Sequence, residues 1–257
     1  MSVAAQQQPV RAVIFDIGGV VAASPFLAIS AYEREHQLPA NYINVALSKK
    51  GDQGAFQRYE RGELKYHDFV DQWTAELNDL EANNQAYRGY LERRALDTQM
   101  VLPRRLAING SVLFGKMMAV AREWNAPVVA LIVWLRQQGY KVAALTNNFV
   151  LEEPSVEEKK RQEELAGLFD VFVESAVVGL RKPDRRFYLH ACNLLGVAPE
   201  ETVFLDDIGQ NLRAAQALGM AAVQVRIGRE AEAVSAVKRI LRVRGAFSAG
   251  VVVRSKI

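Results

Sequence analysis

The chain has 257 residues, of which 50% are hydrophobic and 24% charged, the composition of a folded globular protein rather than a disordered one. Its 32 basic and 29 acidic residues give a formal charge of only +3, and no basic stripe interleaved with aromatic residues is found, so we expect no nucleic acid partner. The single cysteine, Cys192, excludes an internal disulfide and fits a reducing, cytoplasmic compartment.

Neither a signal segment nor a membrane span is expected. Residues 1–9 are small and polar and lack an apolar signal core, so we predict a disordered tail there. The longest apolar run, residues 126–135, has about half of the ~20 residues that a span needs. Pro127 is the second residue of this run, a position that suits the first turn of a helix. We therefore predict a buried helix and a soluble protein with no membrane partner.

The core is predicted from alternating strand and helix patterns. An apolar, β-branched run at residues 11–15 ends at Asp16 and predicts a buried strand followed by a glycine turn. Further strands are predicted at residues 141–145, 170–174, 202–205 and 221–225. Helices are predicted at residues 127–138, 156–168, 184–195, 210–218 and 229–242. This alternation predicts an α/β fold with a Rossmann-like parallel sheet that is covered by helices on both faces.

Residues 22–110 differ, because they hold helical patterns (26–36, 41–48 and 66–77) and no convincing strand. The stretch is too long for a loop between neighbouring elements. We therefore predict an inserted all-helical cap domain at residues 22–110. The catalytic core is predicted at residues 10–21 and 111–242, with tails at 1–9 and 243–257, the second of which is either loose or an edge strand.

Polar side chains stand at or just after the ends of four predicted strands: Asp16, then Thr146, Asn147 and Asn148, then Lys182, then Asp206 and Asp207. In open α/β sheets, ligands bind at this edge. Clustered carboxylates repel one another unless a cation is bound, and oxygen ligands suit Mg²⁺. The set predicts phosphoryl transfer, in which a carboxylate attacks a phosphate while hydroxyl, amide and ammonium groups hold its oxygens.

Four segments, in this order, resemble the motifs of the haloacid dehalogenase (HAD) superfamily, whose members are mostly phosphatases: residues 13–21, Leu145-Thr146-Asn147-Asn148, Lys182-Pro183-Asp184 and residues 204–209. Residues 206–212 and 51–54 are similar, more closely, to the N-terminal phosphatase domain of soluble epoxide hydrolases and to the related N-terminal domain of an acyl-CoA dehydrogenase family member. The resemblance covers about residues 11–242 and implies a HAD-like core with a helical cap.

The resemblance also implies roles for individual residues. The nucleophile would be Asp16. A Mg²⁺ site would be made by Asp16, the main-chain carbonyl of Gly18, Asp207 and, nearby, Asp206. A phosphate site would be made by Thr146, Asn147 and Lys182, and Lys182 would neutralise both the phosphate and Asp16.

One position departs from the family pattern. HAD phosphatases usually carry a second Asp two residues after the nucleophile as general acid and base, and that position is Gly18 here. A metal contact through the main-chain carbonyl survives, but the proton donor does not, and such help is typically worth ~10²–10⁴-fold. A slower phosphatase, an activated leaving group and a different acid are the alternatives. Some sugar-1-phosphate phosphatases of the family also lack this Asp, so its loss does not show inactivity.

Ordinary structural roles are the alternatives for each of these residues. Asp16 would cap a turn, Asp206 and Asp207 a helix, and Thr146, Asn147 and Lys182 would be polar or solvated loop residues. Arg58, Glu60 and Arg61 either line the cap side of the pocket or form a solvated helix face, and we favour the solvated face.

The leading hypothesis is a Mg²⁺-dependent phosphatase of small organic phosphate monoesters that acts through an aspartyl-phosphate on Asp16. The alternatives are a 2-haloacid dehalogenase, which needs neither a proton donor nor Mg²⁺, and a non-catalytic binding protein on the HAD fold. Epoxide hydrolysis is not expected, because 257 residues leave no room for a separate α/β-hydrolase domain and no Gly-x-Ser-x-Gly elbow is found. The oligomeric state stays open, with a homodimer among the alternatives.

Overall fold

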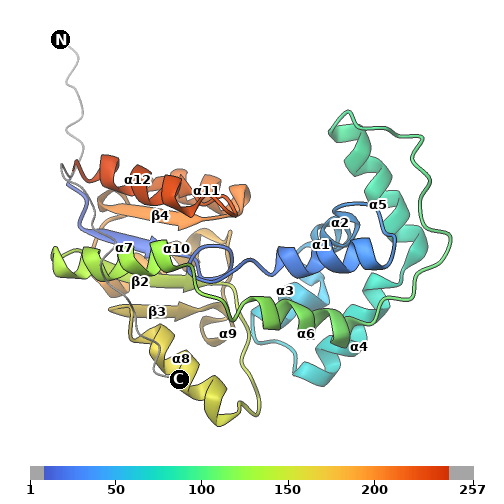
Figure 1. Cartoon of the computed structure of the whole chain (residues 1–257), viewed down its shortest axis with the longest axis horizontal. Helices are drawn as coiled ribbons and strands as arrows, with labels where there is room; N and C mark the ends of the chain where they lie inside the picture. The colour runs from blue at the N-terminus through green and yellow to red at the C-terminus, as the bar shows by residue number, and fades with distance from the viewer. Residues whose placement is uncertain (1–8, 243–257) are drawn as a thin grey trace.

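The computed structural model describes residues 9–242, so the predicted tails lie outside the described residues apart from Pro9 (Figure 1). Five parallel strands form one sheet in the order β3-β2-β1-β4-β5. Their bounds are Ala12–Phe15 (β1), Lys141–Thr146 (β2), Val171–Glu174 (β3), Thr202–Asp206 (β4) and Ala221–Gln224 (β5). The predicted α/β class and parallel sheet are confirmed.

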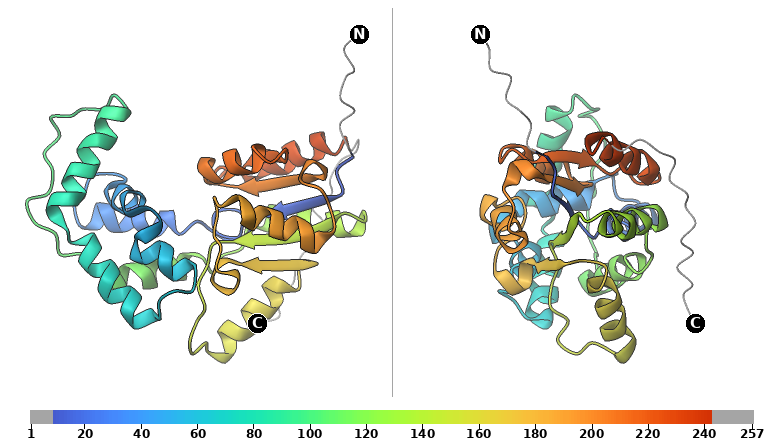
Figure 2. Two further views of the ribbon diagram at one scale, coloured as in Figure 1. Left: turned by 180° about the vertical axis from the view of Figure 1, so that it is seen from behind. Right: turned by 90° about the vertical axis from the view of Figure 1, so that its left-hand side faces the viewer.

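Helices cover both faces of this sheet (Figure 2, right). They are α7 (Ala126–Gln137), α8 (Val156–Ala166), α10 (Arg185–Leu195), α11 (Gly209–Gln216) and α12 (Glu230–Ile240), with the short α9 (Ser175–Val178) after β3 and a 3-10 turn at Pro199–Glu201 before β4. Side chains of β1 alternate between two apolar clusters: Val13 and Phe15 pack in the cluster of α7 and α12, and Ala12 and Ile14 in that of α10 and α11. Burial on both faces explains why β1 is a continuous apolar run.

A second group of helices, here called the helical lobe, lies beside the sheet at one end (Figure 1). It comprises α1 (Phe26–Glu35), α2 (Tyr42–Lys50), the 3-10 turn Gly51–Gln53, α3 (Ala55–Glu60), α4 (Tyr66–Leu77), α5 (Leu80–Arg93) and α6 (Gly110–Val120). An aromatic cluster forms its core, in which Phe69 stacks on Tyr59 at 4.2 Å and on Trp73 at 5.3 Å between ring centroids.

Helix α6 belongs to this lobe, although the sequence assigned residues from 111 onward to the core. Its side chains Leu113, Phe114 and Met117 are buried in the apolar cluster of α1, α3 and α4. The predicted boundary at residue 110 is therefore wrong by one helix, because the apolar stripe of α6 faces the lobe. That the lobe acts as a cap stays a prediction.

Two chain segments join the lobe to the sheet, one after β1 and one before α7. They are hydrogen-bonded to each other: Ala23 N donates to Glu123 O and Asn125 N to Val21 O, both at 2.8 Å. A bridge between Ala22 and Trp124 completes the contact. The paired segments form a short stem that places the lobe at the carboxyl ends of the strands.

Helix α7, which carries the longest apolar run, is a core helix as predicted. Val128, Leu131, Ile132 and Leu135 are each 0% exposed against the sheet. Across residues 9–242, no helix combines the length and the apolar character that a bilayer span requires.

Candidate active site

The register of the two central strands brings Asp16 and Asp206 together. Phe15 pairs with Leu205 in the parallel ladder, and Asp16 N donates to Leu205 O at 2.9 Å, so the next residue of each strand lies side by side. Asp16 is 6% exposed and Asp206 is 0% exposed. Two carboxylates thus stand next to each other at the buried carboxyl edge of the sheet, where the sequence predicted them.

Lys182 lies between these two carboxylates. Its Nζ is 2.7 Å from Asp16 Oδ1 and 2.8 Å from Asp206 Oδ2, and the residue is only 1% exposed. Burial alone lowers the pKa of Lys182, but the two carboxylates more than offset it and hold the pKa above its usual value. The alternative of a solvated lysine is wrong, because this ammonium is a buried charge with two anionic partners.

Asp206 serves this lysine and its own loop. Its Oδ1 accepts from Ile208 N at 2.7 Å, and the side-chain amide of Asn211 donates to both of its oxygens at 3.1 and 3.0 Å. Asn211 is 4% exposed and was given no role from the sequence, although it lies in the 206–212 segment that carries the closer resemblance. Because both Asp206 oxygens already have donors, this carboxylate is better placed to hold Lys182 than to bind a cation.

Asp207 is the opposite case. Its Oδ2 accepts from Ser24 Oγ at 3.3 Å, while its Oδ1 is buried and has no hydrogen-bond partner. Burial, followed by repulsion from Asp206, raises the pKa of Asp207 to about 6. Gly19 leaves space for this side chain, because a Cβ at position 19 would lie 2.1 Å from Asp207 Oδ2. A buried, unpartnered carboxylate oxygen is a candidate ligand for a hard cation.

Together the three aspartates form a candidate cation site. One carboxylate oxygen from each of Asp16, Asp206 and Asp207 lies within 4.8 Å of the others, and within residues 9–242 no other group of three acidic, His or Cys side chains is this close. Burial and the repulsion of the other two aspartates raise the pKa of Asp16 despite the opposing effect of Lys182. Three carboxylates against one ammonium leave excess negative charge, which a divalent cation neutralises.

Gly18 lies in the turn after Asp16 and is bridged to Ala22. A Cβ at position 18 would lie 3.3 Å from Pro25 Cδ, a close but adjustable contact. Position 18 therefore offers no side chain where the resemblance implied a second Asp.

The two predicted phosphate-binding residues after β2 have different surroundings. Thr146 is the last residue of β2, the strand beside β1, and its exposed fraction of 5% is close to the 6% of Asp16. Asn147, in contrast, binds the main chain of Lys182 through both ends of its side-chain amide: Oδ1 accepts from Lys182 N at 2.8 Å and Nδ2 donates to Lys182 O at 3.1 Å. The Asn147 side chain therefore holds the lysine loop, and the second N–H of Nδ2 is not used in that contact.

The helical lobe also contacts the site, which corrects one prediction. Glu60, expected on a solvated face, is only 8% exposed and its Oε2 lies 2.7 Å from Arg181 Nε. The prediction failed because the partner is distant in sequence. Arg58 and Arg61 pair with Glu63 inside the lobe instead.

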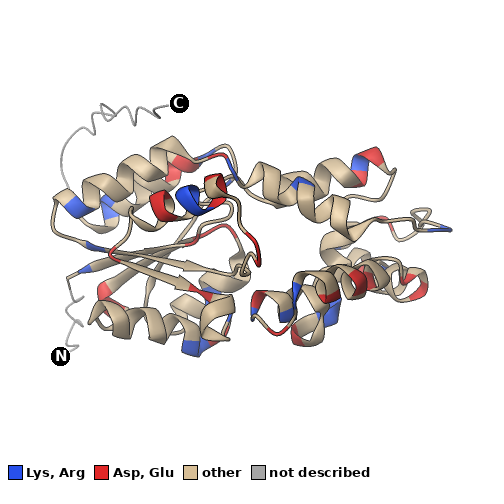
Figure 3. Cartoon of the chain, turned by 90° about the horizontal axis from the view of Figure 1, so that it is seen from below, with Lys and Arg blue, Asp and Glu red and all other residues tan. Residues whose placement is uncertain are grey.

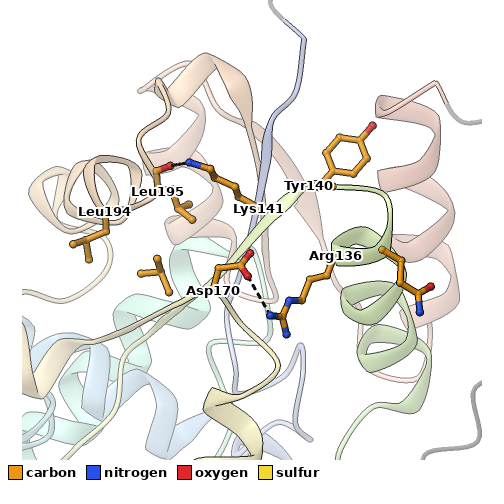
Figure 4. Close-up of a pocket in the computed structure, with 9 residues that line it drawn as sticks. Arg136, Tyr140, Lys141, Asp170, Leu194 and Leu195 are labelled. Atoms are coloured by element: carbon orange, nitrogen blue, oxygen red, sulfur yellow. Dashed lines mark hydrogen bonds and ion pairs between the residues drawn. The ribbon is translucent and has the colours of Figure 1, made fainter.

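The opposite edge of the sheet holds a hollow of about 730 Å³, drawn in Figure 4. Its charged groups have structural partners: Lys141 Nζ donates to Leu195 O at the end of α10, and Arg136 lies 3.3 Å from Asp170. These groups cap helix ends and join elements. In the cartoon of Figure 3, acidic and basic residues are interspersed along both the helical lobe and the sheet with its helices.

Known proteins resemble this chain in sequence and in fold. A family model described as haloacid dehalogenase-like hydrolase matches residues 10–219. Bifunctional epoxide hydrolase 2 of Sus scrofa is 30% identical over 221 residues, which are 84% of this chain and 36% of that protein. Acyl-CoA dehydrogenase family member 10 of Mus musculus is 29% identical over 217 residues, 84% of this chain and 18% of that protein. The chain thus spans about a third of the first relative and less of the second.

A solved HAD-like family hydrolase from Porphyromonas gingivalis superposes with a TM-score of 0.54, at 19% identity, over 92% of this chain and 100% of that one. At this identity the superposition shows a shared fold. The four motifs, the parallel sheet and the family match agree with one another, and the chain belongs to the haloacid dehalogenase-like hydrolases.

Proposed function

We propose that this hydrolase is a Mg²⁺-dependent phosphatase of small organic phosphate monoesters, with Asp16 as its nucleophile. The observation that carries the proposal is the arrangement of three aspartates around one buried ammonium, with a buried oxygen of Asp207 left unpartnered. Lys182 and a cation would offset the charge of an incoming phosphate, which would otherwise be repelled by the carboxylates.

Asp16 would act in two steps. Its carboxylate attacks phosphorus, the bond to the leaving oxygen breaks, and the leaving group takes up a proton from solvent. Water then attacks the aspartyl-phosphate, releases inorganic phosphate and restores the carboxylate. Lys182 Nζ, which lies 2.7 Å from Asp16 Oδ1, would orient the attacking carboxylate. Thr146 at the end of β2 would donate its hydroxyl to a phosphate oxygen.

The residues present fit a magnesium ion. Asp16 and Asp207 would hold it directly, with the main-chain carbonyl of Gly18 as a further oxygen ligand, while Asp206 keeps Lys182 in place. When bound, Mg²⁺ supplies Lewis-acid neutralisation of the phosphate oxygens.

The leaving group must depart without a proton from position 18. The proposed phosphatase should therefore prefer esters of acidic alcohols, whose alkoxides or phenolates leave without protonation, over simple alkyl phosphates. The cytoplasmic location stays a prediction, and a homodimer stays one alternative for the oligomeric state.

A 2-haloacid dehalogenase is the second candidate, favoured by Gly18, because a halide leaves without a proton. Against it stands Asp207, whose buried free oxygen has no use in a metal-independent displacement. Halide release from a panel of 2-haloacids, unaffected by EDTA, would favour this candidate. Phosphate binding without turnover would instead favour a non-catalytic binding protein.

The deciding experiment is phosphate release from p-nitrophenyl phosphate, with Mg²⁺ or EDTA, by the wild type and Asp16→Asn. Asp71→Asn is the matched control, because Asp71 is a surface aspartate of the helical lobe with 68% of its side chain exposed. We expect turnover that needs Mg²⁺, is lost in Asp16→Asn and is kept in Asp71→Asn. Turnover that survives both EDTA and Asp16→Asn would refute the proposal.

A further inference from the structure

The sheet and the helices that cover it are here called the sheet lobe. One residue of the helical lobe contacts the sheet lobe through both its side chain and its main chain. Glu60 is the last residue of α3, and its carboxylate is 2.7 Å from Nε of Arg181, the residue before Lys182. Its main-chain carbonyl accepts a hydrogen bond of 2.5 Å from Oγ of Ser175. Ser175 is the first residue of α9 and is 0% exposed. Glu60 is therefore bound to the sheet lobe at two points.

The second point leads to the loop after β2. Ser175 Oγ also accepts from the main-chain N–H of Asn148 at 2.9 Å. Asn148 follows Asn147, whose carboxamide binds the main chain of Lys182 on both sides. The loop of Asn147 and the loop of Lys182 are thus bound to each other, and both are bound to Glu60, one through Ser175 and the other through Arg181.

The ion pair of Glu60 and Arg181 is shielded from water, with 10% and 19% of the two side chains exposed. An exposed ion pair contributes little, because water and salt screen it. Removing one partner of a shielded pair costs more, because the other charge stays without compensation. The pair therefore favours the arrangement in which the two lobes are in contact.

Two residues after Glu60, the backbone of the helical lobe approaches the backbone of α9 closely. Gly62 has φ +71°, and a Cβ there would lie 2.4 Å from the main-chain oxygen of Ala176. That oxygen belongs to the backbone of α9, so no flexible side chain can move aside. Position 62 can therefore be used to separate the lobes without touching the ion pair.

We propose that Glu60 is a positioning residue: through Arg181 and Ser175 it makes contact between the lobes a condition for placing Lys182 and the loop of Asn147 at the phosphate. The inference rests on the proposed phosphatase function. Glu60 does not touch the reacting atoms, so it acts through the geometry of Lys182. Loss of the contact should lower kcat and leave the proposed metal site, at the ends of β1 and β4, unchanged.

The test compares Glu60→Gln, Arg181→Gln, the double variant and Gly62→Ala with the wild type. Glu63→Gln is the control for charge, because the partners of Glu63 are Arg58 and Arg61 in the same lobe. Gly51→Ala is the control for backbone strain, because Gly51 has φ +56° and a Cβ there meets nothing within 4 Å. The readouts are hydrogen–deuterium exchange of residues 146–149 and 175–184, and kcat, KM and Mg²⁺ affinity with p-nitrophenyl phosphate.

We expect faster exchange of both segments and a fall in kcat of about tenfold or more in Glu60→Gln and Gly62→Ala, with unchanged Mg²⁺ affinity. The double variant should lose no more than Glu60→Gln alone, because the two residues act as one pair. Unchanged exchange and a kcat within about twofold of the wild type would overturn the inference. Equal losses in Glu63→Gln and Gly51→Ala would overturn it too, since they would show a general loss of stability.

The failure of the proposed function would look different. A wild type that releases no phosphate refutes the phosphatase, yet the exchange measurement still reports whether Glu60 holds the two loops. Faster exchange without any turnover would leave the contact established and its catalytic meaning overturned.

Discussion

Asn147 binds the main chain of Lys182 through both ends of its side-chain amide. It accepts from the main-chain N–H of Lys182 at 2.8 Å and donates to the main-chain carbonyl of Lys182 at 3.1 Å. The pairing joins the end of β2 to a loop 35 residues later in the chain. Lys182 Nζ in turn lies between Asp16 and Asp206. The position of the ammonium therefore depends on an amide that touches no carboxylate.

Replacing this amide should slow turnover without weakening the metal site. In Asn147→Leu the side chain keeps its approximate size and loses both hydrogen bonds, so the Lys182 loop is free to shift. A displacement of about 1 Å at a catalytic group can cost ~10²-fold, and we expect kcat to fall by about 10- to 100-fold. Steady-state kinetics and Mg²⁺ titration check this. Asn193→Leu, at an exposed position of α10, is the control and should keep wild-type kcat.

Gly19 tests the space reserved for Asp207. In Gly19→Ala the new Cβ would lie 2.1 Å from Asp207 Oδ2, so the carboxylate must move. We expect the rise in Tm on adding Mg²⁺ to disappear. Gly139→Ala is the matched control: its φ of +83° resembles the +80° of Gly19, but a Cβ there meets nothing within 4 Å. Both variants should lose about 1–2 kcal/mol to left-handed backbone strain. A full Mg²⁺ response in Gly19→Ala would contradict the assignment of Asp207.

Position 18 tests the missing general acid. Gly18→Asp adds a carboxyl group beside the nucleophile, and its Cβ requires Pro25, 3.3 Å away, to shift slightly. We expect a larger gain in kcat/KM for alkyl phosphates than for p-nitrophenyl phosphate, because only poor leaving groups need a proton. Gly18→Ala has the same Cβ without the acid and should show no such difference. An equal change for both substrate classes in Gly18→Asp would count against the explanation.

The raised pKa of Asp207 predicts how stability changes with pH. Folding raises this pKa from 3.8 to about 6, so the folded state binds the proton more tightly than the unfolded state. This group therefore stabilises the metal-free protein at low pH, and the contribution is lost as pH rises from about 4 to about 6. The Tm difference between Asp207→Asn and the wild type, in EDTA, should be larger at about pH 7.5 than at about pH 5.

Carboxylates elsewhere cancel in that difference, since both proteins contain them. Mg²⁺ at the higher pH should raise the Tm of the wild type and have little effect on Asp207→Asn, because a ligand stabilises only the state that binds it. A pH-independent difference would mean that Asp207 titrates as an ordinary surface aspartate.

The sheet and its acidic edge could be predicted because their signals are local. Each strand is an apolar run of a few residues, and the predicted bounds lie within one residue of the observed ones. Asp16, Thr146 and Asp206 are each the last residue of such a run or follow it directly. Since parallel strands place their carboxyl ends at one edge, the order of residues along the chain was sufficient to bring these side chains to the same site.

The partners of the site residues depended on the tertiary structure. Asn211 beside Asp206, Asn147 beside Lys182 and Glu60 beside Arg181 are polar residues in ordinary loops and helices, and the last pair is separated by 121 positions. No period or run marks such contacts, because each exists only after two distant segments have packed. The place of α6 had the same cause: residues from 111 onward were assigned to the core, and only the packing of α6 against α1, α3 and α4 placed it in the helical lobe.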